Sequence, residues 1–266
     1  MVSLLRTLPP VLRARDFHLY LEGGKRITDL WLEGGRAVLG RKPPGILREL
    51  KNAAERGLFS PFPHPLEGRL SKALSKLFPG FVFRTYYVNS PVFETGGSSG
   101  ALPQPRIWRP FLEPEENSPL PPLLLPLLPV PWGLTILALK PELEGTLPPP
   151  DMVPPLLLAP AVRGIYDLIA AAPLRGRLHY PRIERALAEP ACPWERRGIY
   201  LFFKSAGASA DVPAERPGEG APWEALFRRF LDGGFLLPPR PEEPVILPGI
   251  MSDGEEAKLA GLLGQV

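Results

Sequence analysis

Residues 24–30 read GKRITDL, and residues 39–43 read LGRKP. Ahead of the first stretch stands the apolar run FHLYL at residues 17–21, and Gly23 and Gly24 separate the two runs. Two apolar runs around a Gly-Gly turn predict a β-hairpin over residues 17–32. The hairpin is the first regular element that the sequence indicates.

Helical patterns follow the hairpin. Apolar residues recur at helical spacing from Ile46 to Ala54, and Gly57 ends the pattern. A second amphipathic helix is predicted over residues 66–77, with leucines on one face and basic residues on the other. A strand is then expected over residues 81–88.

Regular patterns return near the carboxyl end. Residues 198–203 are nearly all apolar and predict a buried strand. An amphipathic helix over 223–231 and strands at 235–237 and 245–247 come next. Ser252 and Glu255 have the spacing of a capping box, which predicts the start of a last helix.

The middle of the chain is rich in proline. Residues 117–139 carry no charge but contain six prolines, which would leave a membrane-spanning helix with unsatisfied backbone groups. We therefore expect extended, polyproline-like backbone buried in protein there, with one helix at about residues 154–172. No membrane span is predicted.

Composition narrows the function classes. The 31 basic and 28 acidic residues leave a net charge of +3 spread along the chain, which does not indicate nucleic-acid binding. Cys192 is the single cysteine, so no intramolecular disulfide forms, and a cytoplasmic location is expected. His18, His64 and His179 show no metal-ligand spacing with each other or with Cys192.

The order of these elements resembles the class III, fold type I, pyridoxal-phosphate-dependent aminotransferases, a group that includes the glutamate-1-semialdehyde aminomutases. The family's amino-terminal signature runs to Leu-Gly-His and a proline, and here Leu39-Gly40-Arg41-Lys42-Pro43 matches except at the histidine. Residues 67–74 and Pro79-Gly80 resemble its next helix and turn. Residues 197–200, 234–239 and 252–256 resemble its small domain.

The resemblance implies a reduced PLP-dependent transferase-like fold of α/β and α+β class, with an α+β small domain built from both chain ends. The expected parts are an N-terminal hairpin and helix over residues 1–60 that pack with the C-terminal domain, a shortened large domain over 61–188 and the small domain over 189–266. The shortened middle is not expected to hold a sheet of several parallel strands. The family also implies a homodimer.

The residues that carry the family's chemistry are missing or altered. The family holds the cofactor phosphate in a Ser/Thr-Gly loop after the strand that ends here at Val88, whereas this chain has Asn89-Ser90-Pro91. It uses an aspartate on the pyridine nitrogen, but none occurs between Asp29 and Asp151.

The family also needs a lysine for the Schiff base. Lys140 is the only lysine between Lys76 and Lys204, and it lacks the glycines that normally follow. The leading hypothesis is therefore a non-catalytic aminotransferase-like protein without a cofactor, which binds a ligand or a protein partner, with Asn89, Ser90, Arg106 and Arg109 as ligand-binding candidates.

Two alternatives remain. In the first, the protein is a PLP-dependent enzyme with a rebuilt active site, in which Lys140 acts as base or Schiff-base lysine and Arg106 or Arg109 holds a carboxylate. In the second, it is a structural subunit of a larger assembly, with the apolar stretch from Pro119 to Trp132 as its interface.

Overall fold

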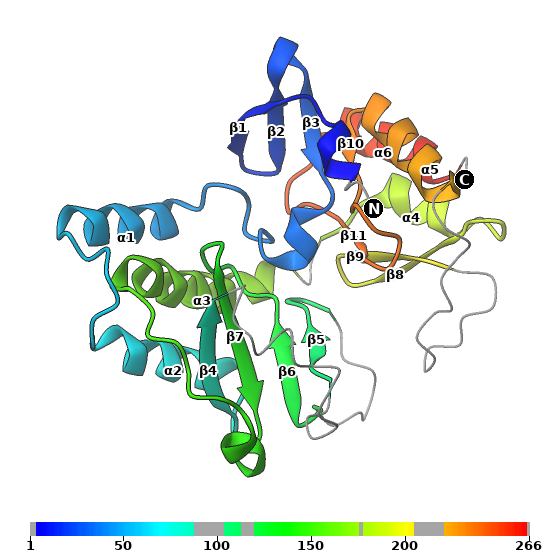
Figure 1. The fold of residues 1–266 in the computed structure, drawn as a ribbon. Coiled ribbons are helices and arrows are strands. Elements are labelled where there is room, and N and C mark those ends of the chain that lie inside the picture. Colours follow the sequence, from blue (N-terminus) through cyan, green and yellow to red (C-terminus); the bar gives the residue numbers. More distant parts are fainter. Residues whose placement is uncertain (1–3, 88–103, 113–119, 176–177, 205–220, 265–266) are drawn as a thin grey trace. The chain divides into compact units, whose positions relative to one another are not determined.

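The computed structural model describes residues 4–87, 104–112, 120–175, 178–204 and 221–264. The chain divides into two compact units (Figure 1). Unit 1 comprises Met1–Arg41, Phe111–Glu113 and Pro173–Val266, and unit 2 comprises Lys42–Pro110 and Pro114–Ala172. Both chain ends thus lie in unit 1, whereas the helix after the hairpin lies in unit 2.

The main sheet of unit 1 has the strand order β1-β2-β3-β10. Its strands are β1 (Val11–Arg15), β2 (His18–Leu21), β3 (Arg26–Asp29) and β10 (Phe235–Leu236). The predicted hairpin is β2 and β3, which pair antiparallel around the short 3-10 turn Glu22–Gly24. Gly23 and Gly24 have φ values of +81° and +80°, which favour glycine.

The parallel pairing of β3 with β10 joins the two ends of the chain. Thr28 pairs with Phe235 and Asp29 pairs with Leu236. Strand β1, which the sequence did not indicate, adds to the outer side of β2. Its side chains are mostly exposed, so it carries little of the apolar periodicity by which strands are recognised.

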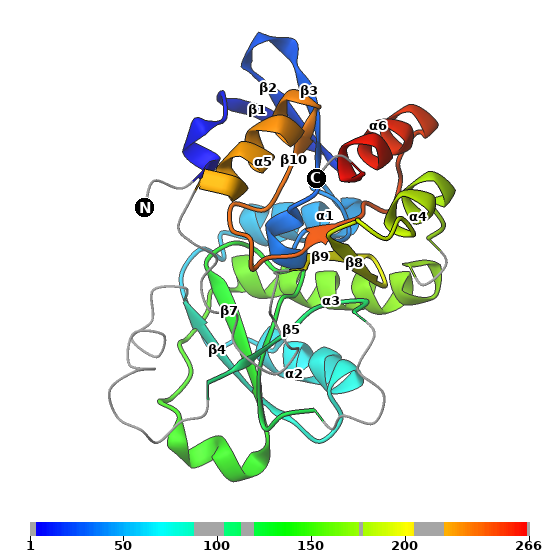
Figure 2. The same ribbon diagram turned by 90° about the vertical axis from the view of Figure 1, so that its right-hand side faces the viewer.

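The second sheet of unit 1 has the order β11-β9-β8. Its strands and the helices of unit 1 are β8 (Trp194–Arg197), β9 (Tyr200–Phe203), β11 (Val245–Ile246), α4 (Pro181–Leu187), α5 (Ala221–Asp232) and α6 (Asp253–Leu263). Helices α4 and α6 pack against each other (Figure 2). Trp194, Phe227 and Phe230 are fully buried in the core of this unit.

Unit 2 contains a four-stranded sheet of order β4-β7-β6-β5. Its elements are α1 (Pro44–Glu55), α2 (Leu66–Leu77), β4 (Val82–Tyr87), β5 (Arg106–Trp108), β6 (Leu123–Pro126), β7 (Leu134–Leu139) and α3 (Pro155–Arg175). The described residues also form short 3-10 segments at Leu4–Thr7, Leu32–Gly35 and Pro141–Thr146. Strand β7 is antiparallel to β4 and β6, and β5 is parallel to β6.

This sheet corrects the expectation of polyproline-like backbone in the middle of the chain. All six side chains of β7 are buried, and its sequence, LTILAL, contains no proline. The single proline of β6, Pro126, is its last residue. A missing N–H at the end of a strand disturbs the hydrogen bonds between the strands least. The middle therefore holds a mixed sheet with one parallel pair, which the high proline content concealed.

Helix α3 is long and apolar enough over Pro155–Ala172 to meet the length and composition criteria for a membrane span, and 44% of that window is buried inside the protein. Its Leu158, Ala161 and Ile165 are buried. A Cβ at Gly164 would lie 2.1 Å from the carbonyl oxygen of Pro129, so the helix packs closely on the turn after β6. We interpret α3 as a core helix of unit 2.

Candidate binding site in unit 2

A cavity of about 330 Å³ lies in unit 2 between α2, β4 and residues 150–158. Helix α2 contributes Glu67, Leu70, Ser71 and Leu74, which share one face because they are spaced at i, i+3, i+4 and i+7. We call this space the α2–β4 cavity. Its volume falls within the range of small-molecule sites.

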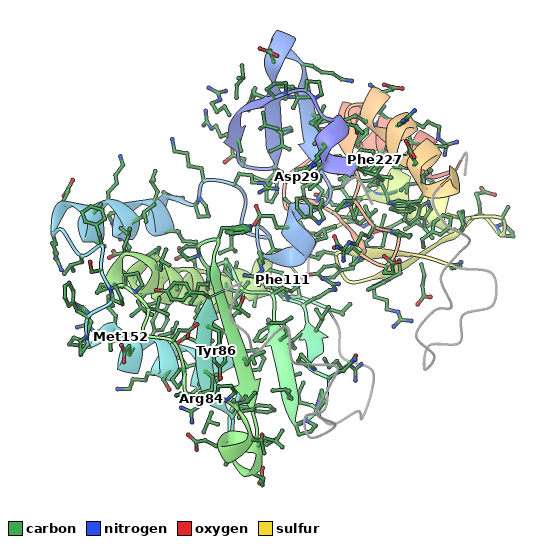
Figure 3. The ribbon with its side chains drawn as sticks, in the orientation of Figure 1. Asp29, Arg84, Tyr86, Phe111, Met152 and Phe227 are labelled. Atoms are coloured by element: carbon green, nitrogen blue, oxygen red, sulfur yellow. The ribbon has the colours of Figure 1, made fainter. Side chains whose placement is uncertain are left out.

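The other walls come from β4 and from the chain before α3. Phe83 and Thr85 are two residues apart on β4, so both point to the same face of the sheet. Pro63, Leu158 and residues 150–153 complete the lining, which is largely apolar. Met152, at the rim, is half exposed (Figure 3).

Residues 150–153 are held by the free edge of β4, an edge strand of its sheet. The Asp151 N–H donates to the carbonyl oxygen of Thr85 at 2.9 Å, and the N–H of Tyr87 donates to Oδ2 of Asp151 at 2.8 Å. The Tyr87 hydroxyl donates to the carbonyl oxygen of Met152 at 3.2 Å. These bonds fix the Asp151 carboxylate beside the carboxyl end of β4.

The charges around the cavity have one sign. Glu67 and Asp151 line it, and no lysine, arginine or histidine is among the described lining residues. Burial raises the pKa of Tyr87, and the nearby negative charge of Asp151 raises it further. A ligand in this space would therefore meet apolar walls and a negative end.

Lys140 does not lie in this cavity. It follows β7, whose Leu139 pairs with Val82 at the beginning of β4, and its Nζ lies 4.3 Å from the ring centre of Phe81. Strand β4 continues to Tyr87, and five steps of about 3.4 Å each make about 17 Å. Lys140 thus sits at the opposite end of β4 from the position after Val88, where the resemblance places the phosphate loop.

Of the other site candidates, Arg106 and Arg109 lie within the described residues. Arg106 is exposed on β5 at the far edge of the sheet, and Arg109, three residues farther along, is buried. Asn89 and Ser90 lie outside the described residues. The described structure therefore does not gather the candidates named from the sequence, and the α2–β4 cavity was not anticipated because its lining comes from three separate segments.

In unit 1, the arginine that stands where the family has a histidine makes an ion pair with a buried carboxylate. Asp29 is fully buried, its Oδ1 accepts the N–H groups of Trp31 and Leu32 at 3.0 Å, and its Oδ2 accepts Arg41 Nε at 2.8 Å. Arg41 also pairs with Glu33. Burial alone would lower the pKa of Arg41, but the charges of Asp29 and Glu33 and their hydrogen bonds outweigh it and raise the pKa.

This ion-paired cluster stabilises the turn after β3. Among the described residues no group of three or more histidine, cysteine, aspartate or glutamate side chains could hold a metal ion. Cys192 is buried.

Known proteins are similar to this chain in sequence and in fold. No family model matches the chain. An uncharacterised protein of Treponema pallidum is 28% identical over 297 aligned positions, spanning 92% of this chain and 91% of that protein. A glutamate-1-semialdehyde 2,1-aminomutase of Thermus thermophilus is 32% identical over 84 residues, which is 32% of this chain and 20% of that enzyme.

Solved structures agree over nearly the whole chain. The ornithine aminotransferase of Plasmodium yoelii aligns with a TM-score of 0.68 at 11% identity, covering 97% of this chain and 93% of that one. A β-phenylalanine aminotransferase of Variovorax paradoxus aligns with a TM-score of 0.67 at 14% identity, covering 97% and 86%. The chain has the fold of the class III aminotransferases. This confirms the fold class expected from the sequence.

The aminotransferase fold corrects one expectation. No cofactor was expected, but the solved structures that share the fold are PLP-dependent aminotransferases, and one, a transaminase with a TM-score of 0.67, holds PLP. The fold therefore points to pyridoxal phosphate rather than to none.

The described residues nevertheless do not fit the family's way of holding that cofactor. The one lysine of the middle, Lys140, lies at the wrong end of β4 for a covalent tether. The described end of β4 carries the fixed carboxylate of Asp151, which would repel a phosphate group. We derive no catalytic step through the cofactor.

Proposed function

We propose that this chain is a non-catalytic member of the aminotransferase fold that binds a small molecule in the α2–β4 cavity. The fold is that of the class III aminotransferases, and the Treponema pallidum protein that matches 92% of this chain is uncharacterised.

The position of Lys140 carries the proposal. Transamination on this fold needs an amine that forms a Schiff base with the cofactor aldehyde while the phosphate is held nearby. In this chain the register of β4 with β7 places Lys140 about 17 Å from the carboxyl end of β4, and its ammonium lies over Phe81. A side chain of this length does not span that separation.

The test is a transamination assay on the whole chain. The protein is supplied with pyridoxal phosphate, a panel of amino donors and 2-oxoglutarate, and amino transfer is followed by chromatography. We expect no turnover above that of a protein-free control, by the wild-type chain or by the Lys140→Ala variant. Turnover by the wild-type chain that Lys140→Ala abolishes would overturn the proposal in favour of the rebuilt enzyme.

Two further proposals concern the state of the protein. A homodimer is proposed because the family implies one, and light scattering at micromolar concentration tests it, with a monomeric mass as the contradicting result. A cytoplasmic location is proposed because Cys192 is buried and without a disulfide partner, as is usual in reducing compartments.

A protein-partner role is supported by exposed apolar side chains in unit 2. Trp132 is 79% exposed and Leu120 is 43% exposed. Leu120 stands before β6 and Trp132 after it. Trp132→Ser should lower the mass measured by light scattering if the turn around it forms the dimer interface, and an unchanged dimer would exclude that turn.

A further inference from the structure

We propose that the α2–β4 cavity binds a small apolar amine, with the carboxylate of Asp151 as counter-ion to its ammonium group. The inference rests on the proposed binding function and adds the chemical class of the ligand. Four features carry it: the composition of the walls, the position of the carboxylate, the contacts of the neighbouring cations and the hydroxyl groups of the lining.

The walls select an apolar body. The apolar side chains of the lining include Leu70 and Leu74 from α2, Phe83 from β4, Leu158 from α3 and Val153. Leu70, Leu74, Val153 and Leu158 are buried, so this surface is part of the packed core of the unit. At about 330 Å³ the cavity suits a single-ring molecule.

The Asp151 carboxylate selects a cation. The backbone N–H of Tyr87 holds Oδ2 at 2.8 Å, which leaves Oδ1 without a hydrogen bond from the described residues. Asp151 is only half buried, so the free oxygen can accept an ammonium donor from a bound ligand. A charge-assisted hydrogen bond of this kind is stronger than one to a neutral donor.

Two cations close to the lining in sequence, Arg84 and Lys76, make contacts outside the cavity. Arg84 lies between Phe83 and Thr85 on β4, and it points to the other face of the sheet, where Nη2 donates to Glu144 at 2.9 Å. On α2, Lys76 Nζ lies 4.9 Å from the ring centre of Tyr166. Glu67 adds a second negative charge at the mouth. An anionic ligand would therefore be repelled, while an ammonium would be attracted.

The two hydroxyl groups of the lining favour a ligand that carries hydrogen-bond donors. Thr85 Oγ1 and Ser71 Oγ both border the cavity. The Thr85 hydroxyl donates to the carbonyl oxygen of Asp151 at 3.4 Å and keeps its lone pairs as acceptors. A primary ammonium has three donors, which carboxylate and hydroxyl oxygens can accept together.

The experiment compares three ligands that share a phenylethyl body on the full chain by isothermal titration calorimetry at pH 7: 2-phenylethylamine, 2-phenylethanol and 3-phenylpropanoate. We expect the amine to bind about 10-fold more tightly than the alcohol and the carboxylate not to bind. Asp151→Asn keeps an oxygen for the Tyr87 N–H but removes the charge. It should bring the amine to the affinity of the alcohol and leave the alcohol unchanged.

Two variants serve as controls. Glu142→Gln removes a carboxylate of unit 2 that does not line the cavity, and it should leave the amine affinity unchanged. Ser71→Phe fills the cavity from an exposed position on α2 and should abolish binding of both the amine and the alcohol, while the unfolding midpoint stays within a few degrees.

The outcomes distinguish the assignment of an amine ligand from binding in the cavity as such. Equal affinities for amine and alcohol, with no effect of Asp151→Asn, would overturn the amine assignment while cavity binding stands. Failure of all three ligands to bind would overturn the cavity as a binding site and the proposed function with it. Binding that survives Ser71→Phe would place the ligand elsewhere and overturn both.

Discussion

His18 Nε2 and Glu255 Oε1 lie 2.8 Å apart, although 237 positions separate the two residues in the sequence. The same carboxylate oxygen also accepts Arg26 Nη2 and Thr28 Oγ1 at 3.2 Å. The other oxygen of Glu255 accepts the N–H and the hydroxyl of Ser252 at 3.0 and 2.7 Å. One carboxylate thus joins the N-terminal hairpin to the last helix and closes its capping box.

The stability of unit 1 should fall in acid because of Glu255. Partial burial would raise the pKa of Glu255, but the hydrogen bonds from Ser252 and His18 outweigh it and lower the pKa to about 2. A carboxylate with a depressed folded-state pKa stabilises the fold above its unfolded pKa, and this is lost as pH falls from about 4.5 toward 2. Glu255→Gln should cost about 2 kcal/mol at pH 7 and flatten this pH dependence, measured by urea unfolding. An unaltered acid limb in the variant would contradict the assignment.

Removal of Arg41 should destabilise unit 1 strongly. Arg41→Ala would leave the fully buried Asp29 carboxylate without its counter-ion, which costs about 3 kcal/mol or more. The control is Arg15→Ala, because Arg15 and Asp16 form an ion pair with side chains 66% and 65% exposed, and its loss should cost under about 0.5 kcal/mol. Equal effects of the two substitutions on the free energy of unfolding would show that the buried pair has no special role.

Gly164→Ala should destabilise unit 2. The added methyl group would lie 2.1 Å from the carbonyl oxygen of Pro129, so α3 or the turn must move, at a cost of about 2 kcal/mol. Gly68→Ala on α2 is the matched control, because no atom lies within 4 Å of the new Cβ. Gly68→Ala should stabilise the helix by about 0.5–1 kcal/mol. A Gly164→Ala variant as stable as the wild type in thermal unfolding would show that α3 does not pack as described.

Pyridoxal phosphate should not form a stoichiometric adduct with Lys140. The lysine stands at the start of β4, over the ring of Phe81, where the described structure offers no phosphate site. After incubation with the cofactor and reduction with borohydride, mass spectrometry should find sparse labelling of exposed lysines such as Lys51 and Lys72. One equivalent confined to Lys140, and lost in Lys140→Ala, would show that this lysine is a genuine Schiff-base residue.

Elements with a clear local signature were predictable from the sequence. The capping box of Ser252 and Glu255 begins α6 as expected, and the leucine pattern of α2 matches the observed helix Leu66–Leu77. Glycines at the hairpin turn and after the helices have positive φ, which is why they mark boundaries so well.

Elements that depend on distant partners were not predictable. Strand β1 has an exposed pattern and forms because β2 offers an edge, and the strands of the middle were hidden by prolines at their ends. The α2–β4 cavity could not be foreseen because Asp151 reaches it by pairing with β4, about 65 residues earlier in the chain. The fold was expected from the order of elements. The expectation that no cofactor binds was wrong, because the absence of a few family residues from the sequence says little about which cofactor a fold retains.

The pairing of β3 with β10 has a consequence for synthesis on the ribosome. Thr28 can pair with Phe235 only after Phe235 has left the ribosome. A loop of about 200 residues must therefore close before the main sheet of unit 1 is complete. Most of unit 2, from Lys42 to Ala172, emerges before that moment. The N-terminal hairpin should therefore keep the β3 edge unpaired while the middle of the chain folds. During that interval the nascent protein would depend on chaperones to shield this strand edge.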